Sequence, residues 1–249
     1  MPRTRRTALA LVTAALSIGV LAGSPAVAGG KAACNDPYDP VITPSDFTNS
    51  HGKPNPINNP YNPLRPGTTY VYDGTKDGED QHDVVAVTKS TKSIIGVTTV
   101  VVRDTVTVAG FLAEDTFDWF AQDDAGNVWY FGEDTKEYDQ QGNVISTFGS
   151  WEAGVDGAKP GIVMEAAPAI GDTYRQELRA AVAEDMASVA SLDETVTVPY
   201  GTFDRVLKTK EFSCIEAGLD YKYYAQGIGL VYVLAARGGK EELSLTSVK

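Results

Sequence analysis

Short runs of β-branched residues, separated by turn residues, fill most of the sequence from Thr68 onward. The run from Ile94 to Thr107 holds five valines and is the clearest of them. Alternation with a period of two places neighbouring side chains on opposite faces of a strand. Because such runs recur about every 10–15 residues with turn residues between them, we predict a mainly β fold. The expected architecture is an antiparallel meander that forms a half-barrel or an open barrel.

Residues 176–191 fit this pattern least well. Their Ala, Glu, Leu and Met content favours a helix by propensity, whereas Leu178, Ala180 and Val182 alternate as in a strand. A strand would continue the meander, but a single helix would need a surface to pack against. We therefore favour a strand in this segment and keep the helix as the alternative.

Residues 29–66 are expected to be an extended arm in front of a β domain at residues 67–249. Eight of the 13 prolines lie between residues 35 and 66, interleaved with Asn and Asp. Proline has a fixed φ and no amide hydrogen, so this segment suits neither a helix nor a central strand. The apolar side chains expected to anchor the arm on the domain are Tyr38, Phe47, Tyr61 and Leu64.

Residues 1–28 have the pattern of a secretory signal peptide. Three arginines precede an apolar run at residues 7–23, and Ala26-Val27-Ala28 supplies small residues for cleavage. The apolar run is too short to span a membrane comfortably, so we expect a secreted, extracellular protein with no integral membrane segment. Loss of the three arginines would change the net charge from −12 to −15.

Export would place the two cysteines, Cys34 and Cys214, in an oxidising compartment. We therefore predict a disulfide between them, which would fasten the arm to the domain. The alternative is a pair of free buried thiols.

Composition argues against several classes of function. Asp and Glu number 33 against 21 Lys and Arg, and no basic stripe is present, so a nucleic-acid partner is not expected. The two histidines, His51 and His82, accompany neither a nucleophile motif nor the ligand spacing of a zinc site.

Three segments carry a resemblance to a known group of proteins. They are Thr68-Thr69-Tyr70-Val71-Tyr72, Val198-Pro199-Tyr200-Gly201-Thr202-Phe203 and Tyr223-Tyr224-Ala225-Gln226-Gly227-Ile228-Gly229-Leu230-Val231. Together they are similar to secreted bacterial β half-barrels that resemble the periplasmic lipoprotein-carrier fold. The resemblance covers residues 66–246 of the chain and implies an open, curved sheet with an apolar concave face. It implies no particular activity, and residues 118–161 have no counterpart in it.

Aromatic and acidic residues are concentrated between residues 118 and 157, which include all three tryptophans. A groove with aromatic platforms and carboxylates can hold sugars or cationic ligands. The plainer interpretation is that the rings are ordinary sheet residues and the acids are solvated strand ends. Simple alternation would put Trp129, Phe131 and Glu133 on one face and Tyr130 on the other. The candidate ligand-binding residues are Asp118, Trp119, Trp129, Tyr130, Glu133, Trp151, Glu152 and Asp156.

Three functions remain open. The first, which we favour, is non-catalytic binding or carriage of an apolar or aromatic small ligand, or of a partner protein. The second is glycan cleavage by two carboxylates, which needs one raised pKa and a suitable separation between the groups. The carboxylates available for it are Asp118, Glu133, Glu152 and Asp156.

The third function is structural, with Ca²⁺ bound by an acidic turn. Residues 123–127 and residues 152–156 offer oxygen ligands, although neither has the twelve-residue calcium-loop pattern. The turn at 123–127 also matches the turn at 139–143, since both place Gly-Asn before a valine. We expect hairpin turns there, with Gly and Asn at positive φ. No other metal or cofactor is expected.

Overall fold

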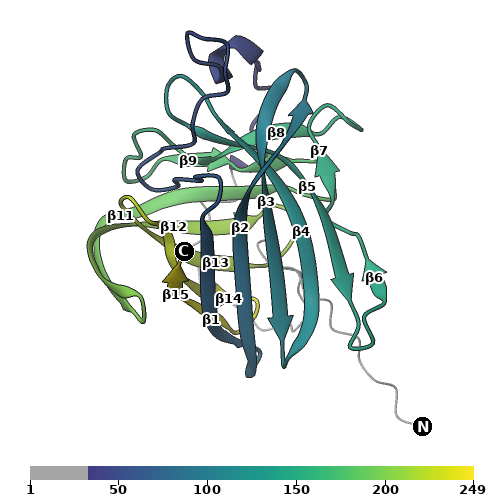
Figure 1. Cartoon of the computed structure of the whole chain (residues 1–249), viewed down its shortest axis with the longest axis vertical. Coiled ribbons are helices and arrows are strands. Elements are labelled where there is room, and N and C mark those ends of the chain that lie inside the picture. Colours follow the sequence, from purple (N-terminus) through teal and green to yellow (C-terminus); the bar gives the residue numbers. More distant parts are fainter. Residues whose placement is uncertain (1–32) are drawn as a thin grey trace.

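The computed structural model describes residues 33–249 (Figure 1), and the expected signal peptide at residues 1–28 lies outside them. Fifteen strands form one antiparallel sheet that nearly closes into a barrel with one unsealed seam. The predicted fold class, an antiparallel meander forming an open barrel, is confirmed. Among residues 33–249, no helix is long and apolar enough to cross a membrane.

The first part of the sheet is a meander in chain order. It consists of β1 (Thr69–Lys76), β2 (Glu79–Ile94), β3 (Val97–Val108), β4 (Phe111–Gln122) and β5 (Val128–Tyr138). Strand β5 then pairs with three short strands, β6 (Val144–Ser146), β7 (Trp151–Glu152) and β8 (Lys159–Met164).

The second part begins with two short strands, β9 (Thr173–Arg175) and β10 (Glu177–Leu178). It continues with β11 (Asp185–Val198), β12 (Gly201–Ser213), β13 (Leu219–Ala225), β14 (Gly229–Arg237) and β15 (Glu241–Val248). Strand β15 pairs with β1 and so joins the two parts. The hydrogen-bonded order ends at β9 on one side and β10 on the other, and the seam lies between them.

The strand predicted over residues 176–191 is confirmed. Strands β10 and β11 both fall in this segment and are separated by a tight turn, in which Ala181 has a φ of 60°. The helix propensity of this segment is outweighed by strand pairing. Strand β10 pairs with β8, and β11 pairs with β9 and β12.

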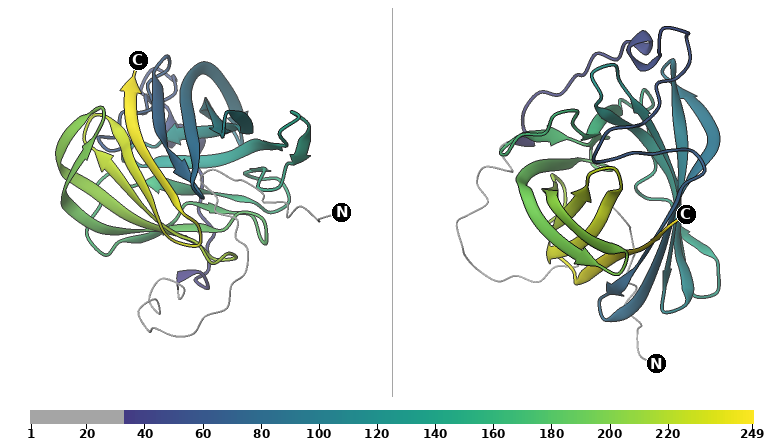
Figure 2. Two further views of the ribbon diagram at one scale, coloured as in Figure 1. Left: turned by 90° about the horizontal axis from the view of Figure 1, so that it is seen from below. Right: turned by 60° about the vertical axis from the view of Figure 1, so that its left-hand side comes forward.

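The two parts of the sheet cross one another. In Figure 1 strands β1 to β5 stand upright, whereas β11 to β14 run across behind them. The right view of Figure 2 shows the green and yellow strands curving round to enclose a space against the blue ones. Hydrophobic residues fill much of this space, including Tyr72, Val102, Leu207 and Leu245.

The arm covers one end of the barrel. Pro60 accepts a hydrogen bond from Gly227 in the β13–β14 turn, at 2.7 Å. Gln122, at the end of β4, accepts hydrogen bonds from the backbone of Asn58 and Asn59 at 2.9 and 2.8 Å. Of the apolar anchors, Leu64 packs into the barrel core. The arm therefore spans the gap between the β4–β5 and β13–β14 turns.

Tyr61 also packs against the barrel core, whereas the other two anchors, Phe47 and Tyr38, lie outside it. Phe47 closes a short 3-10 helix, η1 (Pro44–Phe47), and packs its ring edge-on against Phe131, with the ring centres 5.5 Å apart. Tyr38 donates a hydrogen bond to the carbonyl of Pro160 at 2.8 Å. A second core cluster, which includes Trp119 and Trp151, forms around Phe47 on this side of the sheet.

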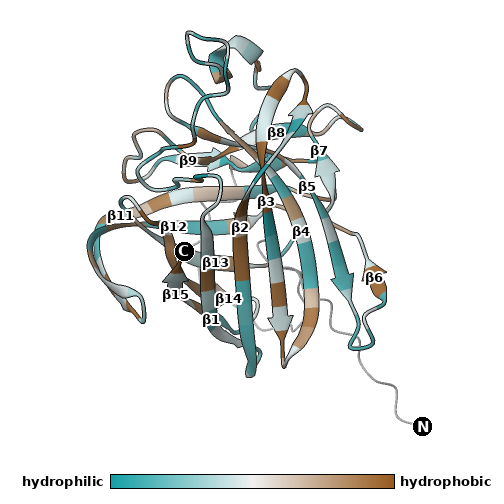
Figure 3. Cartoon of the chain, in the orientation of Figure 1, coloured by the Kyte–Doolittle hydropathy of each residue, from teal (hydrophilic) through white to brown (hydrophobic). Residues whose placement is uncertain are grey.

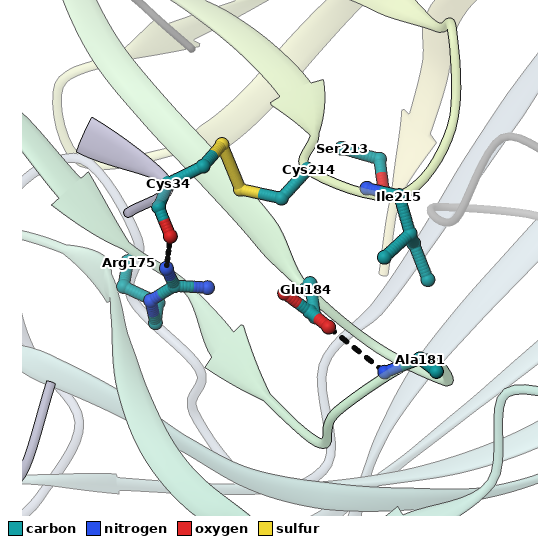
Figure 4. The surroundings of a disulfide bond; sticks show 7 residues. All are labelled: Cys34, Arg175, Ala181, Glu184, Ser213, Cys214 and Ile215. Carbon is teal, nitrogen blue, oxygen red and sulfur yellow. Dashed lines mark hydrogen bonds between the residues drawn. A yellow bond between two sulfur atoms is a disulfide. The ribbon is translucent and has the colours of Figure 1, made fainter. Parts of the chain in front are cut away.

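The predicted disulfide between Cys34 and Cys214 is present, with Cα atoms 5.7 Å apart (Figure 4). It joins the start of the arm to the end of β12. The carbonyl oxygen of Cys34 accepts a hydrogen bond from the guanidinium of Arg175 at 3.1 Å. Met186, Phe212 and Leu219 form a small apolar cluster next to the bond.

The two matched Gly-Asn turns differ from expectation in one respect. Gly126 and Gly142 have φ values of 98° and 80°, but Asn127 and Asn143 are not in the left-handed region, so that part of the prediction is wrong. Each asparagine instead donates backbone and side-chain hydrogen bonds to an aspartate four residues before it, Asp123 or Asp139. These bonds hold the turn without a positive φ at asparagine.

Candidate ligand cavity in the barrel

The barrel contains a partly open cavity of about 180 Å³ beside the arm. Its apolar wall comes from aromatic and aliphatic side chains on strands from both parts of the sheet. They include Tyr72, Val85, Val102, Phe120, Val163, Tyr224, Leu230, Val233 and Leu243. Asn62 and Leu64 of the arm lie at its covered end.

Polar side chains complete the lining, and we call this set the polar wall. It carries the carboxyl groups of Asp83, Asp104, Asp118, Asp220 and Glu241. Strand alternation places them there: Asp104, for example, lies between Val102 and Val106 on the inward face of β3. Figure 3 shows the change along β2, which passes from hydrophobic residues to hydrophilic ones toward its lower end. The interior is therefore mainly apolar, as the resemblance implied, but it also carries carboxyl groups that the resemblance did not predict.

A bulge in β5 places two carboxyl groups within hydrogen-bonding distance of the hydroxyl of Tyr130. Asp118 pairs with Glu133 and Phe120 pairs with Tyr130, so β5 has one extra residue between the two pairs. The hydroxyl of Tyr130 lies 2.6 Å from Oδ1 of Asp118 and 3.1 Å from Oε2 of Glu133. The predicted alternation, with Tyr130 facing away from Glu133, is therefore wrong.

This triad requires a bound proton. A phenol has one hydrogen to donate, so the second carboxyl must hold a proton of its own to make a hydrogen bond to the phenol oxygen. Burial raises the pKa of Asp118 to about 7, against a hydrogen bond from Tyr130 that lowers it. Burial and the neighbouring Glu177 also raise the pKa of Glu133.

Asp83 and Asp104 form a second close pair, hydrogen-bonded to each other. They lie on neighbouring strands and are 3% and 8% exposed. Burial raises the pKa of Asp83 to about 6. Burial also raises the pKa of Asp104 well above its usual value, and the charge of Asp83 raises it further. Within residues 33–249, Oδ1 of each carboxyl is buried with no hydrogen-bond partner.

Lys222 is the one basic residue among those that line the cavity. Its ammonium lies 2.8 Å from Oε2 of Glu211. Thr209 and Tyr224 donate hydrogen bonds to Oε1 of the same glutamate, at 2.9 and 3.0 Å. Lys222 and Glu211 thus form an internal ion pair whose carboxylate is fully hydrogen-bonded.

The structure separates the residues of the predicted site. Asp118 and Tyr130 line the barrel cavity. Five others line a distinct outer groove of about 360 Å³, which also contains Lys92 and Arg179. Those five are Trp119, Glu133, Trp151, Glu152 and Asp156.

The tryptophans are not open platforms in this groove. Trp119 and Trp151 are only 7% and 3% exposed, and the ammonium of Lys92 lies 3.4 Å from the ring centre of Trp119. Trp129 is in neither cavity: its indole nitrogen donates to Asp123 at 2.8 Å. Four residues that line the cavity were not among the predicted site residues: Asp83, Asp104, Asp220 and Lys222.

The arrangement of the acidic side chains bears on the predicted calcium site. Among residues 33–249, no group of three or more His, Cys, Asp or Glu side chains is placed to hold a metal ion. The acidic turns proposed for calcium use their carboxylates within the protein. Asp123 accepts hydrogen bonds from Asn127 and Trp129, and Asp156 lies 3.3 Å from the guanidinium of Arg179.

Comparison with known proteins assigns this chain to no family. No protein-family model matches the sequence, and no curated protein matches it. Among solved structures, the crystal structure of a protein described as a "putative lipoprotein" from Parabacteroides distasonis ATCC 8503 is similar over 76% of this chain and 98% of that chain. The TM-score is 0.40 and the sequence identity 13%, and we argue nothing from a likeness this distant.

Proposed function

We propose that this protein is an exported binding or carrier protein that holds one small, largely apolar ligand inside its barrel. The observation that carries the proposal is the largely apolar cavity of about 180 Å³ inside the barrel. An engineered apolar cavity of about 150 Å³ binds benzene, so this space suits a ligand about the size of one substituted ring. Ligand sites are typically apolar cavities with a few placed polar groups, as here.

Two features support export. The Cys34–Cys214 disulfide is a bond that persists in oxidising compartments and is rare in the cytosol. The signal-peptide pattern of residues 1–28 agrees with it. We therefore place the binding function outside the cytoplasm.

The contacts of the candidate carboxylates favour binding over glycan cleavage. Glu152 lies 2.7 Å from the ammonium of Lys92, and Asp156 is paired with Arg179, so these two candidate carboxylates already have cationic partners. Asp118 and Glu133 share the hydroxyl of Tyr130 inside the protein. Asp118 lines the barrel cavity whereas Glu133 lines the outer groove, so the two carboxyls do not open onto one common cleft that could hold a glycan chain.

Binding of toluene, followed by saturation-transfer NMR, tests the proposal. We expect the native protein to bind toluene. The variant Val85→Phe should not bind it, because the larger side chain fills the cavity. Val84→Phe is the matched control, since Val84 is the adjacent residue of β2 and faces the opposite side. Overpacking costs about 1–3 kcal/mol, so melting curves must show that both variants are folded.

The milder cavity-filling change Val163→Leu provides a second test if Val85→Phe does not fold. Absence of toluene binding to the native protein would contradict the proposal. Equal binding by the native protein and by folded cavity-filled variants would place the ligand elsewhere. A partner protein that binds with the cavity blocked would support the other form of the binding hypothesis.

A further inference from the structure

Negative charge predominates on the polar wall of the cavity. Five carboxyl groups line it, against the single ammonium of Lys222, although one of the five, Glu241, also lies 3.7 Å from the ammonium of Lys76. The ammonium of Lys222 is already paired with Glu211, and both side chains are less than a tenth exposed. The wall therefore has more potential negative charge than its own cation can balance.

Two of the carboxyl groups have unused hydrogen-bonding capacity. Oδ1 of Asp83 and Oδ1 of Asp104 are buried without a partner in the described part of the chain. Burying a charged or polar atom without a partner is unfavourable, and a carboxylate oxygen can only accept hydrogen bonds. A ligand that completes this wall must therefore be a hydrogen-bond donor.

Three tyrosines that line the cavity already use their hydroxyl hydrogens in other hydrogen bonds, which leaves their rings as the part available to a ligand. Tyr72 donates to the carbonyl of Leu230 at 3.1 Å, Tyr130 donates to Asp118, and Tyr224 donates to Glu211. The rings of these three tyrosines line the cavity with Phe120. Aromatic faces attract cations, and the attraction grows when water is excluded.

We propose that the ligand is a small protonated amine with an apolar or aromatic body, whose ammonium group binds Asp83 and Asp104. This inference rests on the proposed function, because it names the class of ligand for the same cavity. The ammonium supplies the hydrogen-bond donors and the positive charge that the polar wall lacks. The apolar body of the ligand occupies the space between Phe120, Val163 and Leu230.

Binding should displace a proton. The hydrogen bond between Asp83 and Asp104 needs a proton on one of them, and an incoming ammonium would replace it, releasing that proton to solvent. The other titratable groups around this pair also come from the barrel interior. They are Tyr72 on β1, Glu114 and Asp118 on β4, Asp220 and Lys222 on β13, and Glu241 on β15.

Three probes of similar size and different charge test the proposal: benzylamine, benzyl alcohol and benzoate. In isothermal titrations at about pH 8, where alkylamines are protonated, we expect benzylamine to bind at least about tenfold more tightly than benzyl alcohol. Benzoate should not bind measurably. Repeating the amine titration in buffers with different ionisation enthalpies should reveal the released proton.

The variants Asp104→Asn and Asp83→Asn should reduce the preference for amine over alcohol to within about threefold, since amides retain the shape but not the charge. Asp134→Asn, which changes an exposed aspartate of β5, is the matched control and should leave the preference intact. Because burial disfavours the charged form of both carboxyls and an amide is neutral and similar in shape, we expect both proteins to stay folded.

The outcomes separate the two proposals. If benzyl alcohol binds as tightly as benzylamine, the amine is excluded but a ligand cavity is still supported. If the amine preference survives in both Asp→Asn variants, the ammonium binds elsewhere and the inference is wrong. If none of the probes, toluene included, binds the native protein, the inference fails together with the proposed function.

Discussion

Inside the barrel, Nζ of Lys222 lies 2.8 Å from Oε2 of Glu211, and the two side chains are 9% and 8% exposed. Burial lowers the pKa of Lys222, but the nearby negative charge of Glu211 raises it, and the net result is a raised pKa. The pair is thus a fixed element of the interior. It provides the one basic group beside a wall of carboxyls, and its loss would leave an uncompensated charge.

The change Lys222→Met should therefore lower the free energy of unfolding by about 3–5 kcal/mol. Guanidinium denaturation at neutral pH measures the effect. Adding Glu211→Gln should restore much of the loss, because the amide oxygen can still accept from Thr209 and Tyr224. Lys89→Met, at an exposed position of β2, is the control. A small loss for Lys222→Met, similar to that of the control, would show that the pair does not form.

The alternation of residues was enough to predict the sheet and its antiparallel order. In β3 the buried positions of Val102, Asp104 and Val106 follow the period of two directly. Alternation could not predict the seam between β9 and β10, because strands of only three and two residues are too short to show a period of two. The bulge in β5 was also missed, since it depends on how Gly132 approaches the backbone of Trp151 in β7.

The cavity residues left a signal in the sequence that strand alternation alone could have revealed. Asp104 interrupts an inward row of valines, and Lys222 lies between Asp220 and Tyr224 on one face of β13. What alternation could not show is that these faces meet. The pairing of β1 with β15 joins the two parts of the sheet, so that residues far apart in the chain, such as Asp104 on β3 and Lys222 on β13, line one cavity.

The interior carboxyls should make stability fall as pH rises. Burial raises the pKa of Asp118 and Asp185 to about 7 and that of Asp83 to about 6, from a usual value of 3.8. Between those values the folded protein retains protons that the unfolded chain has released, so each pH increase favours unfolding. The melting temperature should drop from about pH 5 to about pH 8.

Asp118→Asn provides the comparison, because an amide does not titrate. Its melting temperature should depend less on pH than that of the native protein and should exceed it at the alkaline end of the range. Asp134→Asn, whose carboxyl is exposed, should leave the profile unchanged. A native melting temperature that rises from about pH 5 to pH 8 would mean that these groups are ionised and paired in the folded state.

Reduction of Cys34–Cys214 should destabilise the protein by about 2–5 kcal/mol, since the bond closes a loop across a sequence separation of 180 residues. Melting with and without a reducing agent measures this. The variant Cys34→Ser/Cys214→Ser should melt at the temperature of the reduced native protein and should not respond to the reductant. If reductant leaves the native melting temperature unchanged, the bond either does not form or contributes nothing to stability.

The arm depends on the side chain of Gln122, which accepts from the backbone of Asn58 and Asn59 and donates to the side chain of Asn58 at 2.8 Å. Gln122→Ala removes all three bonds and should cost about 1–3 kcal/mol, because the two amides lose their acceptor. The barrel itself should stay folded, so the loss should appear mainly as faster hydrogen exchange in residues 55–64. Gln141→Ala, at an exposed turn, is the matched control. Uniformly faster exchange throughout the barrel would show instead that the arm is part of the cooperative core and does not open separately over the cavity.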